Sequence, residues 1–264
     1  MTHAAVWRVW ESLDKLLKPF WVDLHVHTTL SPCGELEMGA PEIVAAAREA
    51  GLDIIAITDH NSLDNWEAVE KASGGTPLVL PGIEVQTAED VHLVSLFEEP
   101  KTAQVFKEWL WERMPQIPND PDIFGYQVII DSENQIIGME DTLLIQVVGY
   151  EVDTIIEKIH ALNGLAILAH VDRPSFSYPA NLGPIPFDYP VDALELSRRM
   201  DNIGADVWRG NYPDRVFVRS SDSHELHTLK RTNGTKMILA EPSFEEIRKA
   251  FLGKDGRRVV WPWG

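Results

Sequence analysis

The sequence predicts an α/β fold in which parallel strands lie inside a layer of helices. Short apolar runs alternate with helical patterns along the chain, which is typical of repeated strand–helix–strand units. We count about seven strand-plus-connection units, and 264 residues suffice for one domain spanning residues 1–264. Several of the apolar runs end in histidines or acids, and strand ends are where barrel enzymes place their chemistry.

The first elements are an amphipathic helix, a strand and a second helix. Residues 6–17 carry tryptophans and leucines along one side, which predicts a helix packed against the rest of the fold. The next apolar run ends in His25 and His27, whose imidazoles should point to the same side of a strand. Pro41 then begins a helix over 42–50 that a glycine closes.

The next elements repeat the order strand, helix, strand. Residues 53–57 predict a strand that leads to His60. Ser62 can cap a helix over 63–72, and another apolar run leads to Glu84.

The segment 101–150 breaks this rhythm. It follows an apolar run that opens with His92, and it predicts a Trp-rich helix and a hairpin with strands over 126–130 and 135–137. We interpret this helix-plus-hairpin segment as an insertion in the barrel. It could cap the site or be a plain structural elaboration.

The last third of the chain resumes the alternation and ends in a helix that Ser243 opens with a capping-box pattern. His170 and Asp222 each follow an apolar run. The expected elements are a helix over 152–162, strands over 165–169, 193–197, 216–218 and 236–239, and that last helix.

Charge and apolar patterning argue against several classes of protein. The formal net charge of −18 disfavours a surface that tracks long nucleic acids, because such binding depends on Lys and Arg neutralising phosphates. No apolar run is long enough to span a membrane, and the first residues lack a signal-peptide pattern, so we expect a cytoplasmic protein. The single Cys33 cannot form an internal disulfide, which fits a reducing compartment.

Histidines gather at strand ends more than packing alone explains. A single buried histidine is more often a core residue than a metal ligand. Six of the nine histidines nevertheless occupy such positions, together with two carboxylates. These residue types favour one polynuclear metal centre formed by His25, His27, His60, Glu84, His92, His170, Asp222 and His224.

Five short motifs contain all of these residues except His92: Asp23-Leu24-His25-Val26-His27, Ile57-Thr58-Asp59-His60-Asn61, Gly82-Ile83-Glu84, Ala169-His170 and Ser221-Asp222-Ser223-His224. In this order they resemble the PHP family, the polymerase and histidinol phosphatase superfamily, from about Trp21 to His224. The resemblance implies a distorted (β/α)7 TIM-like barrel that holds up to three divalent metal ions and hydrolyses phosphate esters.

Carried over residue by residue, the resemblance implies three metal sites, of which the first two share a bridging Glu84. The first site has His25, His27, Glu84 and Asp222, the second has Glu84, His92 and His170, and the third has His60 and His224.

The third site needs one more residue from the loop after His27. Related proteins often carry His or Asp there, whereas spacing gives Cys33 in this chain. A thiolate is a softer ligand than a carboxylate, so we expect two or three ions of zinc, iron or manganese. The alternative is that Cys33 is a small buried thiol beside two intact histidine ligands.

Two further carboxylates and two arginines lie near these motifs. Asp59 precedes His60 and could support a ligand or cap a helix, and Asp23 could orient one of the first two histidines. Arg173 follows a ligand-bearing strand and Arg198 follows the strand over 193–197. Both are candidates for binding a substrate phosphate, although either could form a surface ion pair.

The expected function is metal-dependent hydrolysis of a small phosphorylated metabolite, with nucleotides or nucleoside bisphosphates favoured. Closely spaced metals bind phosphate oxygens and activate water, so no side-chain nucleophile is required. Histidinol phosphate and the ends of short oligonucleotides are alternative substrates. A non-catalytic PHP module with structural metals is the alternative outside enzymes, and the nearly complete ligand set disfavours it.

Overall fold

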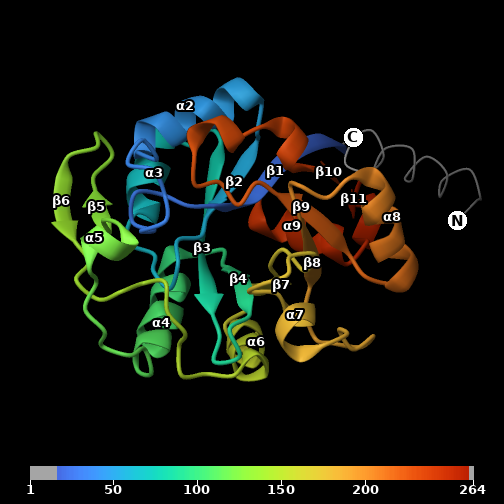
Figure 1. The fold of residues 1–264 in the computed structure, drawn as a ribbon. Coiled ribbons are helices and arrows are strands. Elements are labelled where there is room, and N and C mark those ends of the chain that lie inside the picture. The colour runs from blue at the N-terminus through green and yellow to red at the C-terminus, as the bar shows by residue number, and fades with distance from the viewer. Residues whose placement is uncertain (1–16, 262–264) are drawn as a thin grey trace, which may run out of the picture.

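The computed structural model describes residues 17–261, so the helix expected over 6–17 lies outside the described residues apart from its last position. The main sheet confirms the α/β fold class (Figure 1). Its strands, in spatial order, are β11 (Arg258–Val259), β10 (Thr235–Leu239), β1 (Lys18–Val26), β2 (Ile54–Ile57), β3 (Leu78–Gln86), β4 (His92–Leu96), β7 (Leu165–Leu168), β8 (Ala193–Ser197) and β9 (Phe217–Ser220).

The sheet closes into a barrel because the chain after β9 returns to β1. Val26 forms a parallel bridge with Ser223, and the His27 amide donates a 3.0 Å hydrogen bond to the Ser223 carbonyl. β10 pairs antiparallel with the first half of β1, between Lys18 and Val22. The closure therefore involves the end of β1 that carries the two histidines.

The expectation of uniformly parallel strands is wrong at β10, which pairs antiparallel with β1, and at β4. β4 runs antiparallel to both β3 and β7, and its register places His92 opposite Gln86. Parallel strands need a crossover of a dozen or more residues, and the segment 87–91 is far too short for one. The chain therefore turns back as a hairpin, which brings His92 to the end of the barrel where Glu84 lies.

The helices cover the outside of the barrel, as the alternation predicted (Figure 1). Gly51 ends its helix in the left-handed conformation, and Ser243 caps the last helix by accepting a hydrogen bond from the Glu246 amide. Ser62 is not a cap, because its helix begins after Asn65. The helices are α2 (Ala40–Ala50), α3 (Trp66–Ser73), α4 (Pro100–Trp111), α5 (Pro121–Phe124), α6 (Val152–Ala161), α7 (Tyr178–Leu182), α8 (Asn202–Asn211) and α9 (Phe244–Phe251), with short 3-10 turns η1 (Leu226–Thr228), η2 (Arg231–Asn233) and η3 (Lys254–Gly256).

The segment 101–150 contains most of α4, then α5 and a hairpin of β5 (Val128–Ile130) and β6 (Ile136–Met139). This hairpin forms a two-stranded sheet of its own at one side of the molecule (Figure 1). The expected insertion therefore has the predicted composition of a helix followed by a hairpin.

Apolar side chains from the barrel strands fill one part of the interior. They include Val22, Ile54, Leu80, Val94 and Ile167, each at most 3% exposed. Burial of this kind supplies the main driving force for folding. Among the described residues, no helix is long and apolar enough to cross a membrane.

Candidate metal centre

β1 directs two candidate ligands into the barrel through a local irregularity. Its register with β2 shifts between Asp23 and Val26. Val22 packs in the interior cluster whereas Val26 packs with the outer helices, although strict alternation would place both on one side. Such a bulge re-aims side chains, and here the Nε2 atoms of His25 and His27 lie 3.1 Å apart.

The Glu84 carboxylate lies at the centre of the histidines and is 1% exposed. Imidazole nitrogens surround both of its oxygens. Oε1 lies 2.8 Å from His92 Nδ1, 3.2 Å from His25 Nε2 and 3.3 Å from His170 Nε2, and Oε2 lies 3.0 Å from His60 Nδ1 and 3.3 Å from His27 Nε2. A carboxylate in this position can bridge metal ions through its two oxygens.

Three groups of described side chains have ligand atoms within 4.8 Å of one another: His25 with His27, Glu84 and Asp222, then His60 with Glu84 and His92, then His27 with His60 and His224. The first group is the set expected for the first metal. His170 reaches the second group through Glu84, and Cys33 Sγ lies 3.3 Å from His60 Nε2 in the third. The structure thus brings all nine candidate ligands together, and their binding of metal remains a proposal.

The arrangement of the ligand atoms suits bound divalent ions better than it suits hydrogen bonds between the ligands themselves. His60 Nδ1 and Glu84 Oε2 are buried without a hydrogen-bond partner, although they lie 3.0 Å apart. Buried polar atoms rarely stay unpaired, because each unpaired atom costs free energy. A cation between them would satisfy both atoms.

The candidate ligands differ in protonation. Burial raises the pKa of Glu84, but His92, His25 and His60 more than offset this and hold the pKa well below its usual range. Burial lowers the pKa of His92 to about 4, so that its ring is neutral at pH 7. The Cys33 side chain is exposed rather than buried. Removal of part of the surrounding water raises the pKa of its thiol, but His60 and His224 more than offset this and lower the pKa to about 5. Burial lowers the pKa of His25 and of His60, but neighbouring anionic groups more than offset this and raise both pKa values well above their usual range. Metal ligands must be deprotonated, so metal binding would displace protons from these two rings.

The loop after β9 carries Asp222 and His224. Asp222 adopts a left-handed backbone with φ 47°, and its Oδ1 lies 3.2 Å from His27 Nε2. Arg173 forms an ion pair with Asp222, and the Arg198 guanidinium donates to the carbonyls of Ser221 and Asp222 at 2.5 and 3.1 Å. Both arginines therefore border the centre, and both already contact the Asp222 loop.

Sequence reasoning did not find Glu195. This β8 residue is 1% exposed, and its two oxygens lie 3.1 and 3.2 Å from His25 Nδ1. One of them also accepts a 3.1 Å hydrogen bond from the His170 amide. Carboxylates that accept from the second ring nitrogen orient metal-ligating histidines. The available signal was a single acid inside an otherwise apolar strand.

Asp59 supports the loop after β1 and does not cap a helix. Its carboxylate accepts hydrogen bonds from the Thr28 amide and from the Ser31 hydroxyl, both at 2.7 Å. Ser31 Oγ lies 2.9 Å from His27 Nδ1, so Asp59 acts on that ligand through Ser31. Asp23 accepts from the His25 and Ser221 amides, so it fixes backbone rather than a ring.

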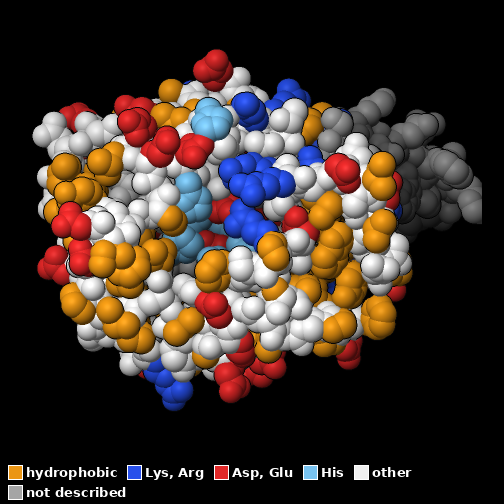
Figure 2. Space-filling view, in the orientation of Figure 1, with side chains coloured by type: hydrophobic (Ala, Val, Ile, Leu, Met, Phe, Trp, Pro, Cys, Tyr) orange, Lys and Arg blue, Asp and Glu red, His pale blue; other side chains and the backbone are white. Residues whose placement is uncertain are grey.

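The centre opens to the surface in a hollow. Figure 2 shows histidine and acidic side chains at its floor, Lys and Arg side chains along one rim and hydrophobic side chains along the opposite side. Metals at the floor and cations at the rim would suit an anionic substrate.

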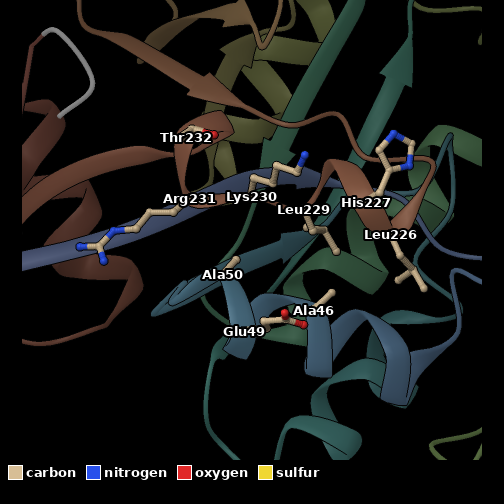
Figure 3. Close-up of a pocket in the computed structure, with 9 residues that line it drawn as sticks. All are labelled: Ala46, Glu49, Ala50, Leu226, His227, Leu229, Lys230, Arg231 and Thr232. Carbon is tan, nitrogen blue, oxygen red and sulfur yellow. The ribbon is translucent and has the colours of Figure 1, made fainter.

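A second cavity of about 440 Å³ lies between α2 and the η1–η2 segment. Figure 3 shows Arg231 pointing away from Lys230 and His227 rather than toward them. Part of the cavity lining is apolar and consists of Ala46, Ala50 and Leu229. The cationic side chains of this cavity therefore do not converge on one point, whereas the side chains of the candidate metal centre converge on Glu84.

Comparisons with known proteins agree on the family. The family model for the PHP domain matches residues 23–182. The lesion-specific endonuclease PfuEndoQ from Pyrococcus furiosus superposes with a TM-score of 0.67 at 20% identity, over 92% of this chain and 58% of that chain. A two-domain protein from Bacteroides vulgatus, which contains a predicted PHP-like metal-dependent phosphoesterase, gives a TM-score of 0.53 at 15% identity over 92% of this chain and 64% of that chain.

The chain thus spans less than two thirds of the length of either of these structures, whose low identities support the fold alone. No curated protein matches the chain. The family model covers more than half of its residues and includes the motifs from Asp23 to His170. This chain belongs to the PHP domain family.

Proposed function

We propose that the chain is a metal-dependent phosphoesterase that hydrolyses a small phosphorylated metabolite, with nucleotides and nucleoside bisphosphates as the favoured class. The observation that carries this proposal is Glu84, whose two oxygens are surrounded by five imidazole nitrogens from separate parts of the barrel. Two or three zinc, iron or manganese ions held there would bind phosphate oxygens, activate water and stabilise the charge that develops in the transition state.

The protein's own contribution is to position the ligands and the substrate. Glu195 and Ser31 hold the rings of His25 and His27, which keeps their Nε2 atoms directed at the centre. Arg173, whose side chain is 32% exposed, could exchange its contact with Asp222 for a phosphate. Arg198 fixes the Asp222 loop by donating to two of its carbonyls, so we assign it a weaker part in phosphate binding.

DNA is a second candidate substrate because of the fold. EndoQ, which superposes over most of this chain, has been crystallised with a 27-mer duplex substrate carrying an abasic lesion. The net charge of −18 favours small substrates instead, because each phosphate of a long duplex would need a neutralising cation.

Phosphate release from a panel of substrates tests the proposal. The panel contains phosphomonoesters including histidinol phosphate, nucleoside bisphosphates, short single-stranded oligonucleotides and a duplex with an abasic site. We expect turnover of small esters that stops with a chelator and returns with Mn²⁺, Zn²⁺ or Fe²⁺. Cleavage of the duplex alone would replace the small-substrate proposal, and no turnover with any metal would favour a non-catalytic module.

A further inference from the structure

An apolar groove of about 360 Å³ lies between the loop that follows β1 and the β5–β6 hairpin. We call it the hairpin groove. Its apolar lining is Leu36, Tyr126, Val128, Ile130, Ile136 and Met139. In Figure 2, the side of the molecule with the hairpin carries hydrophobic side chains opposite the basic rim of the hollow.

The groove walls are held together by hydrogen bonds. The Val128 amide donates to the Thr29 carbonyl at 2.9 Å, and the Thr29 hydroxyl donates back to the Val128 carbonyl at 3.1 Å. The buried Asn65 side chain donates to the Val128 carbonyl at 2.9 Å and accepts from the Ile130 amide at 3.0 Å. These hydrogen bonds hold the insertion in place as one wall of the hairpin groove. The groove is therefore formed before a ligand binds.

One end of the groove lies close to the third candidate metal site. Leu36 is three residues from Cys33, which limits the separation of their Cα atoms to about 11 Å. The Glu35 amide donates to the His224 carbonyl at 2.9 Å. Gly125, just before Tyr126, packs so tightly that a Cβ there would lie 2.1 Å from the Pro32 carbonyl oxygen. The insertion and the Cys33 loop thus form one continuous surface.

The chemistry of the lining selects an uncharged occupant. Leu36, Tyr126, Ile136 and Met139 are between 48% and 69% exposed. The polar side chains of the lining are already paired: the Thr29 hydroxyl as above, and Asn134 with the Ala40 amide and the Glu42 carboxylate. Among the described residues, none that lines the groove carries a charge. Binding here would rest on removal of apolar surface from water.

We propose that the hairpin groove binds an uncharged apolar group on the alcohol portion of the substrate, while the phosphate lies at the metal centre. This inference rests on the proposed function. It names the substrate class as phosphate esters whose alcohol carries an extended aliphatic or aromatic group, recognised by size rather than by hydrogen bonds.

A series of alkyl phosphates tests the inference. We expect the kcat/KM of the metal-loaded protein to rise from butyl to octyl phosphate by at least about tenfold, since each fully buried methylene is worth roughly fourfold. Ile136→Ser should remove most of that gain. Ile123→Ser is the matched control, because Ile123 is 72% exposed on the same insertion but does not line the groove. The control should keep the full chain-length dependence.

Calorimetric titration of the same phosphates into the metal-loaded protein gives a readout that needs no turnover. If no ester is hydrolysed but octyl phosphate binds more tightly than butyl phosphate and Ile136→Ser cancels the difference, the proposed function fails and the groove assignment stands. Equal binding and turnover along the series would overturn the groove assignment alone. A dimer that Ile136→Ser dissociates, with no effect on alkyl phosphates, would overturn it in favour of a second copy of the chain.

Discussion

Replacing Glu195 by glutamine should weaken metal binding without unfolding the barrel. Burial raises the pKa of Glu195, but His25 more than offsets this and holds the pKa below its usual value, so the carboxylate is ionised. Both of its oxygens contact His25 Nδ1, and one of them also accepts a hydrogen bond from the His170 amide. Glutamine has nearly the same shape, but it carries no charge and offers one acceptor oxygen in place of two.

The magnitude follows from the change in hydrogen-bond strength. A hydrogen bond to an ionised group contributes about 1.5 to 3 kcal/mol, and one between neutral groups about 0.5 to 1.5 kcal/mol. The substitution should therefore reduce the free energy that holds the His25 ring in its metal-binding orientation by about 1 to 2 kcal/mol. This corresponds to roughly a five- to thirtyfold increase in the Kd for metal. Because the same carboxylate also accepts a hydrogen bond from the His170 amide, the weakening should extend beyond the site that contains His25.

Competition with a metal-binding dye measures this Kd, and circular dichroism checks the fold. Glu246→Gln is the matched control, since Glu246 is also a buried carboxylate, 4% exposed, but lies on α9 among Arg257 and Lys249. A Glu195→Gln protein with the wild-type Kd, or a control that loses metal equally, would refute the role given to Glu195.

Three further predictions concern the ligands, the substrate and pH. Elemental analysis should find that Glu84→Ala disturbs at least two metals and Cys33→Ser only the third, and equal losses would mean that the bridging ligand is misassigned. Arg173→Ala should lower kcat/KM by roughly ten- to hundredfold through loss of one charge-assisted contact, whereas Asp222→Asn should mainly lower kcat; an unchanged kcat/KM would remove Arg173 from the site. Burial raises the pKa of Glu246, but hydrogen bonds from a guanidinium, a backbone amide and an ammonium group lower it to about 2. Its ionised form therefore stabilises the fold above pH 4.5 by about 2 to 3 kcal/mol, and this stabilisation is lost as the pH falls from 4.5 toward 2. Urea unfolding of wild type and Glu246→Gln should converge over that interval, and a constant difference would contradict the assignment.

Much of the candidate centre could be predicted from the sequence because ligand types and strand patterns are local. His25 and His27 share a side of a strand, and Glu84 and Asp222 each follow an apolar run. The direction of β4 was predicted wrongly, although the short segment before His92 already excluded a crossover.

Glu195 and the contacts of the two arginines were harder to predict. Glu195 is 170 residues from His25 and 25 from the His170 amide, and no periodic pattern connects them. The ion pair between Arg173 and Asp222 likewise joins residues far apart in the chain. Such pairings depend on how the barrel closes, so they are not readable from any one segment.

Strained backbone around the centre indicates that its geometry is imposed by the surrounding structure. His170 and Asp222 have φ values of 29° and 47°, which non-glycine residues adopt only when neighbouring contacts compensate. Glu195 accepts from the His170 amide, and Arg198 donates to the Asp222 carbonyl. The same side chains that hold these two strained residues also contact the candidate ligands or their loop. The geometry of the candidate centre and the strained backbone are thus stabilised by one set of buried polar contacts, which is how a rigid scaffold preorganises a functional site.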